Sequence, residues 1–209
     1  MKETCLMGSA VRVCFVGDSF VAGVGDESHR GWAGRLISRA IERGYQLTGY
    51  NLGIRGDTSA LIGQRFVSEC EPRLAPGDYA VGVVFSFGVN DVIRRGGQPR
   101  VAPSQRVENL DALIDEARQR DWPVLMIGPP PISDDELNDE LRELDAQLLE
   151  RCRARSVPYL SVFWPLVADA QWRSEVAADD GAHPRGSGYE LLAELVDEGW
   201  ASWLQNICG

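Results

Sequence analysis

Few residues of this sequence could carry acid–base chemistry near neutral pH, and several candidate catalytic residues follow predicted strands. Ser19 comes after an apolar, β-branched run that Gly17 breaks, which is typical of a buried strand ending in a tight turn. A serine hydroxyl held at such a turn acts as a nucleophile when a base and an oxyanion site converge on it. The sequence has two histidines, His29 and His183, so candidates for the base are few.

His183 is the candidate base, because Asp180 stands three residues before it. That spacing lets the Asp180 carboxylate accept a hydrogen bond from imidazole Nδ1–H, which leaves Nε2 free to deprotonate Ser19. The structural alternative is a helix-capping aspartate followed by an exposed loop histidine. His29 lies in a polar run and is interpreted as a solvated side chain. Two histidines are too few for a three-histidine metal site, and a Ser–Lys dyad is not expected because the one lysine is Lys2.

Gly56 and Asn90 follow two further predicted strands and are candidate oxyanion donors. An attacked ester develops negative charge on its carbonyl oxygen. The backbone N–H groups of Ser19 and Gly56 and the side-chain amide of Asn90 would supply three donors to that oxygen. Gly53 is the second candidate for the backbone donor. Each residue also has a structural alternative, since Gly56 suits a turn with positive φ and Asn90 suits an ordinary turn after a strand.

Strands and helices are predicted to alternate along the whole chain. Strand patterns lie at 11–16, 45–52, 79–87, 123–128 and 157–163, and helical patterns at 32–43, 57–74, 103–120, 133–152 and 187–207. This alternation predicts right-handed βαβ units. We therefore expect an α/β fold in a single domain over residues 1–209, with its core at about 11–206. The expected architecture is a three-layer α/β/α sandwich of the flavodoxin-like type, with a doubly wound, mainly parallel five-stranded sheet.

In a parallel sheet the loops after the strands share one edge, where ligands bind. Ser19, Gly56 and Asn90 fall in such loops, and His183 falls just before the last helix, so these distant positions can meet there.

Local signals predict how some elements begin and which side they bury. Ser133 and Glu136 form a capping-box pattern for the helix that follows. Ile41 and Leu195 are placed on the inward faces of their helices, and residues 93–102 are predicted to be a polar loop.

Composition limits the class of partner and the compartment. The net charge of −10 and the pI of about 4.7 argue against nucleic acid or an anionic membrane as the main partner. No signal peptide or membrane-spanning run is evident, so no integral membrane association is expected. The odd number and wide spacing of the cysteines favour reduced thiols and a cytoplasmic location. These residues are Cys5, Cys14, Cys70, Cys152 and Cys208.

Four short blocks resemble, in family order, the signature blocks of the SGNH hydrolases, the GDSL-type lipases and esterases. They are Gly17-Asp18-Ser19-Phe20, Asn51 to Thr58 (NLGIRGDT), Gly88-Val89-Asn90-Asp91 and Asp180-Gly181-Ala182-His183. Phe20 stands where the family usually has leucine. The resemblance implies Ser19 as nucleophile and His183 as base, with Asp180 orienting the base. It also implies Gly56 and Asn90 as oxyanion donors.

The leading hypothesis is a serine esterase or acylhydrolase that uses no metal or cofactor. It would hydrolyse a small carboxylic ester or thioester with a short acyl chain, through an acyl-enzyme on Ser19. Residues 92–102, 128–133 and 164–172 would form the substrate walls. An acyltransferase, or an esterase of acetylated sugars, shares the same first half-reaction. The alternative from another class is a nucleotide- or phosphate-binding domain that uses the glycines of residues 17–25. This segment lacks the third glycine of a dinucleotide fingerprint, and the sequence has no P-loop motif.

Overall fold

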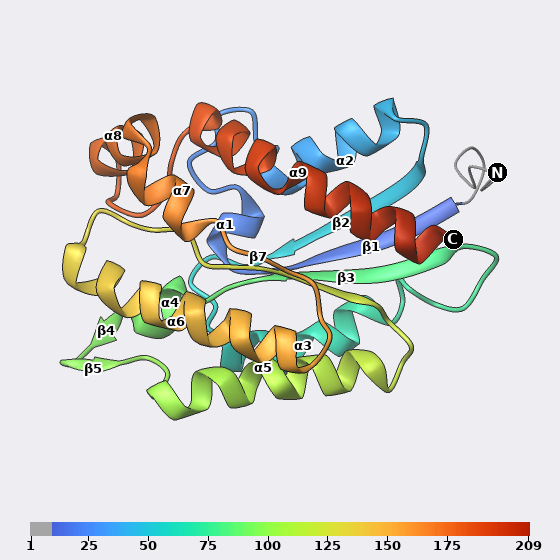
Figure 1. Cartoon of the computed structure of the whole chain (residues 1–209), viewed down its shortest axis with the longest axis horizontal. Coiled ribbons are helices and arrows are strands. Elements are labelled where there is room, and N and C mark those ends of the chain that lie inside the picture. Colours follow the sequence, from blue (N-terminus) through green and yellow to red (C-terminus); the bar gives the residue numbers. More distant parts are fainter. Residues whose placement is uncertain (1–9) are drawn as a thin grey trace.

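The computed structural model describes residues 10–209 as a parallel sheet between two layers of helices (Figure 1). The strand order is β2-β1-β3-β6-β7, and all four pairings are parallel. This order is the doubly wound arrangement of flavodoxin-like folds, so the predicted α/β sandwich is confirmed. The strands of this sheet are β1 (Ala10–Gly17), β2 (Gln46–Gly53), β3 (Ala80–Ser86), β6 (Val124–Ile127) and β7 (Tyr159–Leu160).

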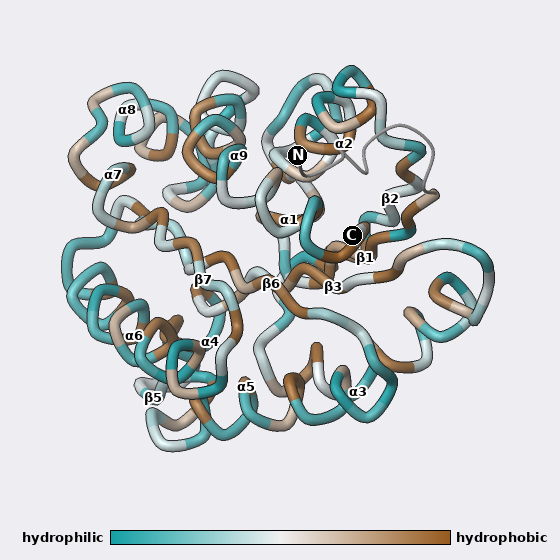
Figure 2. The backbone as a smooth tube through the Cα atoms, turned by 45° about the vertical axis from the view of Figure 1, so that its right-hand side comes forward, coloured by the Kyte–Doolittle hydropathy of each residue, from teal (hydrophilic) through white to brown (hydrophobic). Residues whose placement is uncertain are grey.

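Helices cover both faces of the sheet, as Figures 1 and 2 show from two directions. One face carries α2 (Gly31–Glu42), α7 (Phe163–Ala168), α8 (Ala170–Ala178) and α9 (Gly186–Cys208). The other face carries α3 (Ser59–Cys70), α5 (Pro103–Arg118) and α6 (Asp135–Ala154). None of the helices within residues 10–209 is long and apolar enough to span a membrane.

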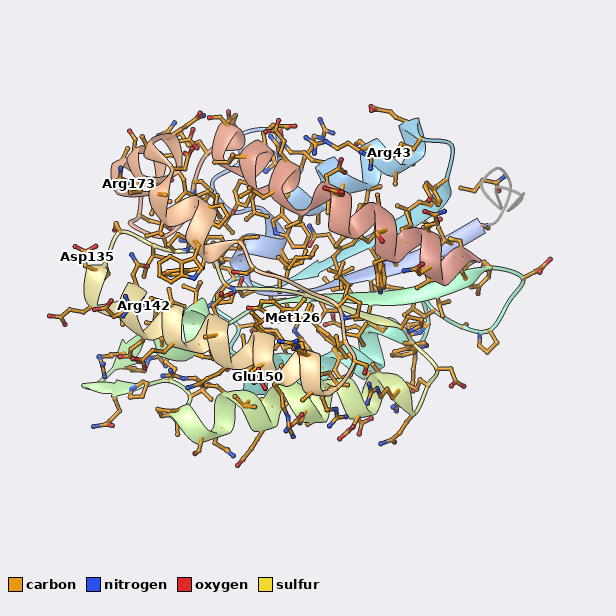
Figure 3. The ribbon with its side chains drawn as sticks, in the orientation of Figure 1. Arg43, Met126, Asp135, Arg142, Glu150 and Arg173 are labelled. Atoms are coloured by element: carbon orange, nitrogen blue, oxygen red, sulfur yellow. The ribbon has the colours of Figure 1, made fainter. Side chains whose placement is uncertain are left out.

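The central strands are apolar because helices bury them from both sides. Val13, Phe15 and Val84 have no exposed surface. Figure 2 shows hydrophobic residues gathered along β1, β3 and β6. In Figure 3 Met126 lies in the interior, whereas the charged side chains of Arg142 and Glu150 lie on the solvent side of α6. The hydrophobic effect therefore places the strand ends, and the loops that follow them, at a fixed edge.

Three regions that we predicted as loops contain regular structure. Ser19 is the first residue of a short helix, α1 (Ser19–Ala22), and Asn90 belongs to another, α4 (Val89–Val92). The polar segment 93–102 includes a small antiparallel hairpin of β4 (Arg94–Arg95) and β5 (Gln98–Pro99). Elements this short carry too few periodic residues to be read from sequence.

The capping-box prediction for α6 is wrong. Asp134 is the N-cap, and its side chain accepts a hydrogen bond from the Leu137 backbone N–H at 3.0 Å. The Ser133 hydroxyl instead donates to the carbonyl of Gly181, so it contacts the loop before His183. A carboxylate one residue later thus competes successfully for the cap.

Two predicted core residues are exposed. Ile41 is 52% exposed and Leu195 is 39% exposed. Each helix buries a narrower stripe than its apolar pattern suggests, since Ile41 lies about 100° around the helix from the buried Ala40.

The cysteines described as buried free thiols are Cys14, Cys70 and Cys152, whereas Cys5 lies outside the described residues.

Candidate active site

Ser19 lies at the junction between β1 and α1. Gly17 allows this close turn, because a Cβ there would come within 2.0 Å of the Ser86 carbonyl oxygen on β3. Asp18 is the N-cap of α1 and accepts a hydrogen bond from the Phe20 backbone N–H at 3.0 Å. The strand, the glycine and the cap together hold Ser19 in place, with 4% of its surface exposed.

Ser19, His183 and Asp180 form a continuous chain of hydrogen bonds. His183 Nε2 lies 2.7 Å from Ser19 Oγ, and His183 Nδ1 lies 2.7 Å from Asp180 Oδ2. The other carboxylate oxygen of Asp180 accepts the backbone N–H groups of Ala182 and His183 at 3.0 and 2.9 Å. These bonds fold the loop into an Asx-type turn that orients the imidazole.

The two aspartates near Ser19 have opposite pKa shifts. Partial burial by itself would raise the pKa of Asp180, but the hydrogen bonds from the His183 backbone and imidazole and from Ala182 outweigh it and lower the pKa to about 2. Burial raises the pKa of Asp18 to about 7, although the Phe20 N–H bond opposes the shift. The negative charge of Asp91 adds to the rise. Of these two residues, Asp180 is therefore the one whose ionised form is stabilised.

Acid should remove the stabilisation that the Asp180 carboxylate contributes. Its pKa of about 2 in the folded chain lies below the ordinary 3.8, so ionised Asp180 favours the folded state above about pH 4. This contribution is lost as the pH falls through about 2. We expect the difference in unfolding free energy between wild type and Asp180→Asn to be largest near neutral pH and to shrink towards pH 2, as urea titrations across that range would show. A difference that did not change with pH would contradict this.

The loop around His183 fits tightly against the segment after α1. The Phe20 ring packs on the imidazole, with ring centroids 4.9 Å apart. Gly25 has φ of 91°, and a Cβ there would lie 2.5 Å from the Pro184 carbonyl oxygen. Tyr189 on α9 donates its hydroxyl to the Val24 carbonyl at 2.8 Å. The replacement of the family's leucine by Phe20 therefore supplies a wall for the imidazole.

The two candidate backbone donors, Gly53 and Gly56, differ in availability. The Gly53 N–H already donates to Asn51 Oδ1 at 3.0 Å. Gly56 has φ of 84° and an open position for a Cβ, and its N–H has no hydrogen-bond partner among residues 10–209. The loop between them is tied to the end of β1, because the Ile54 N–H donates to the Gly17 carbonyl at 3.0 Å.

Asn90 reaches the same edge of the sheet from α4. Its Nδ2 donates to Asp18 Oδ2 at 3.3 Å, so it contacts the residue next to Ser19, and 8% of its surface is exposed. Its neighbour Asp91 points away and accepts the Ser59 backbone N–H at 2.8 Å, which anchors the start of α3. The side chain of the exposed His29 forms no hydrogen bond with Ser19, Asn90, Asp180 or His183.

We did not anticipate that two arginines would organise the site. Arg65 on α3 donates to the Gly17 and Leu52 carbonyls, both at 2.9 Å, and joins the ends of β1 and β2. Its place between Ile62 and Phe66 on the buried face of α3 is the signal that could have identified it. Arg55 donates to Asp180 Oδ2 at 3.0 Å, across a contact that the sequence does not foreshadow.

The described residues contain no cluster of three or more His, Cys, Asp or Glu side chains that could hold a metal ion.

Residues 15–191 match the GDSL-like lipase/acylhydrolase family. The chain belongs to this family. It is 32% identical to esterase TesA of Pseudomonas aeruginosa over 57% of this chain, although the match spans only 55% of that protein. It is 26% identical to an arylesterase of Vibrio mimicus, over 88% of this chain and 86% of that one.

Solved structures agree on the fold. A lipolytic G-D-S-L family protein from Veillonella parvula superposes with a TM-score of 0.74 at 19% identity, covering 92% of this chain and 99% of that one. The family and the names of these relatives describe hydrolases of the esterase/acylhydrolase class.

Proposed function

We propose that the protein is a serine esterase that hydrolyses a carboxylic ester or thioester through an acyl-enzyme on Ser19. The observation that carries this proposal is the unbroken hydrogen-bonded chain from Ser19 Oγ through His183 to Asp180, with 2.7 Å at each imidazole nitrogen. This is the arrangement in which a neutral imidazole removes the serine proton while a carboxylate stabilises the imidazolium that forms.

In the first half-reaction, Ser19 Oγ attacks the carbonyl carbon and its proton passes to His183 Nε2. The carbonyl π electrons move to oxygen and form a tetrahedral oxyanion. Collapse of this intermediate breaks the bond to the leaving alcohol or thiol, which takes the proton from Nε2 as it departs. Water then attacks the acyl-enzyme with His183 again as the base, and the carboxylic acid and free Ser19 are released.

The oxyanion is assigned to the N–H groups of Ser19 and Gly56 and to Nδ2 of Asn90. The unpartnered Gly56 N–H supports this choice over Gly53, whose N–H is already engaged. The Asn90 amide uses one N–H on Asp18 and keeps its second for the substrate. Preorganised donors of this kind supply a large share of the catalysis of acyl transfer.

The acyl group is proposed to be short, as the small domain leaves little room for a lid. Ser19, Asn90 and His183 are each at most 8% exposed, so only a small part of each is accessible to a substrate. The names of two relatives, an esterase and an arylesterase, support an ester as the substrate.

The nucleotide-binding alternative is not favoured, because packing accounts for the glycines of the loop. A Cβ on Gly23 would lie 2.8 Å from Gly31 Cα, and one on Gly25 would lie 2.5 Å from the Pro184 carbonyl. These glycines allow close backbone contacts rather than forming a phosphate cradle.

The proposal is tested with a fluorophosphonate probe and turnover of p-nitrophenyl acetate. We expect the probe to label Ser19, identified by mass spectrometry of the labelled peptide, and labelling to require His183. His29→Ala is the matched control and should keep both labelling and turnover, since His29 is exposed and its side chain forms no hydrogen bond with Ser19 or His183. Folded wild-type protein that takes no label, or takes it elsewhere than Ser19, would overturn the mechanism.

Removing the Asn90 amide should slow the chemical step selectively. Loss of one oxyanion donor typically lowers kcat by about 10² to 10³, or about 3 to 4 kcal/mol of transition-state stabilisation. We expect Asn90→Ala to show this loss with little change in KM. Asn206→Ala, an exposed position on α9, should behave as wild type. Steady-state kinetics would contradict the role of Asn90 if KM alone rose.

A further inference from the structure

The hairpin after α4 is fastened to the helix that carries Asn90. The Arg100 N–H donates to the Ile93 carbonyl at 3.0 Å, and the Val101 N–H donates to the Asp91 carbonyl at 3.1 Å. These two contacts close the base of the hairpin that β4 and β5 form, which lies beside α4 in Figure 1. The backbone at Arg100 therefore has a defined position relative to Asn90.

The Asn90 amide has a hydrogen-bond donor at its oxygen and a hydrogen-bond acceptor at its nitrogen. Arg100 Nη1 donates to Asn90 Oδ1 at 3.3 Å, while Asn90 Nδ2 donates to Asp18 Oδ2 at 3.3 Å. A flipped amide would place an N–H against the guanidinium, which is a donor only. This pair of partners therefore selects the orientation in which Nδ2 faces the turn that carries Ser19.

Arg100 forms no salt bridge with any residue in 10–209, unlike Arg94 on the same hairpin, which pairs with Glu140. The Arg100 side chain is half-buried, and its charge also acts on the buried Asp91 carboxyl. Its only side-chain hydrogen bond in that range goes to Asn90. A positive charge beside the oxygen of an amide strengthens the amide dipole. The amide N–H then becomes a better hydrogen-bond donor to an oxyanion.

We propose that Arg100 is a positioning residue for the oxyanion donor Asn90, and this inference rests on the proposed esterase function. Its guanidinium fixes the direction of the amide and adds positive charge behind it. The effect should appear when the oxyanion forms, so Arg100 should act on kcat rather than on KM.

The test compares Arg100→Ala and Arg100→Lys with Arg153→Ala, a control at an exposed arginine on α6, outside the proposed substrate walls. With p-nitrophenyl acetate we expect Arg100→Ala to lower kcat by about tenfold or more, part of the loss for a whole donor, with KM within about twofold. Arg100→Lys should recover part of the loss because it restores the charge. Arg153→Ala should match wild type.

A double variant distinguishes positioning from a general structural effect. If Arg100 works through the amide, Arg100→Ala should cost nothing further in an Asn90→Ala background. An equal loss in both backgrounds, or wild-type kinetics for Arg100→Ala, would overturn the inference. Should Arg100→Ala fail to fold, Arg100→Gln carries the same comparison.

Labelling of Ser19 separates this result from failure of the proposed function. If wild type is labelled and active and Arg100→Ala has the same kinetics, only the role of Arg100 is refuted. Wild type that is neither labelled nor active refutes both.

Discussion

Ser19→Ala is expected to lower kcat for p-nitrophenyl acetate by about 10⁴- to 10⁶-fold, the range seen when a serine nucleophile is removed. Without Oγ no acyl-enzyme forms, and only the oxyanion donors and substrate binding are left to assist water. The change removes one oxygen from a residue that is 4% exposed and begins a short helix, so the fold should survive.

The measurement is steady-state turnover with fluorophosphonate labelling, alongside thermal unfolding of the same preparation. Ser104→Ala is the control, an exposed serine in α5. Turnover within about tenfold of wild type in folded Ser19→Ala would mean that the hydrolysis does not proceed through this serine.

His183→Ala should cause a loss of similar size, about 10⁴- to 10⁶-fold in kcat, because Ser19 is then left without a base. Its Nε2 lies 2.7 Å from Ser19 Oγ, and no other imidazole in residues 10–209 contacts that hydroxyl. Phe20 also loses the ring it packs against, so unfolding should be monitored alongside kinetics.

Residues that act as one unit give losses that do not add. The double variant Ser19→Ala, His183→Ala should therefore be about as slow as either single variant. If the two losses multiplied, Ser19 and His183 would be acting independently, and the hydrogen bond between them would not be part of catalysis.

The elements that could be predicted from the sequence are those with long periodic patterns. β1 and β3 are buried on both faces and read as apolar runs, and α9 keeps its pattern over 23 residues. Alternation of such elements is sufficient to predict the doubly wound sheet. α1, α4 and the β4–β5 hairpin are two to four residues per element, so tertiary contacts rather than periodicity decide their form.

The candidate site divides in the same way. Its principal residues follow strands or lie in short motifs, which makes them visible in the sequence. Of the arginines that support them, Arg65 has a signal in its place on α3, whereas Arg55 and Arg100 have none. Arg55 acts over a long sequence separation, and Arg100 acts from a hairpin too short to show a periodic pattern. Arg55 and Asp180 are 125 positions apart, and nothing near either residue indicates their contact.

The nucleophile and its base are 164 positions apart, and the loop that carries the base leads directly into the last helix. Arg35 on α2 donates to the Gly186 carbonyl at 3.0 Å, so the start of that helix docks against a segment made much earlier. A nascent chain on the ribosome therefore presents Ser19 long before it can present His183. The proposed esterase activity should therefore appear only after His183 and α9 have been made, and nascent chains or fragments that lack His183 should be unreactive towards the ester bonds of the cell.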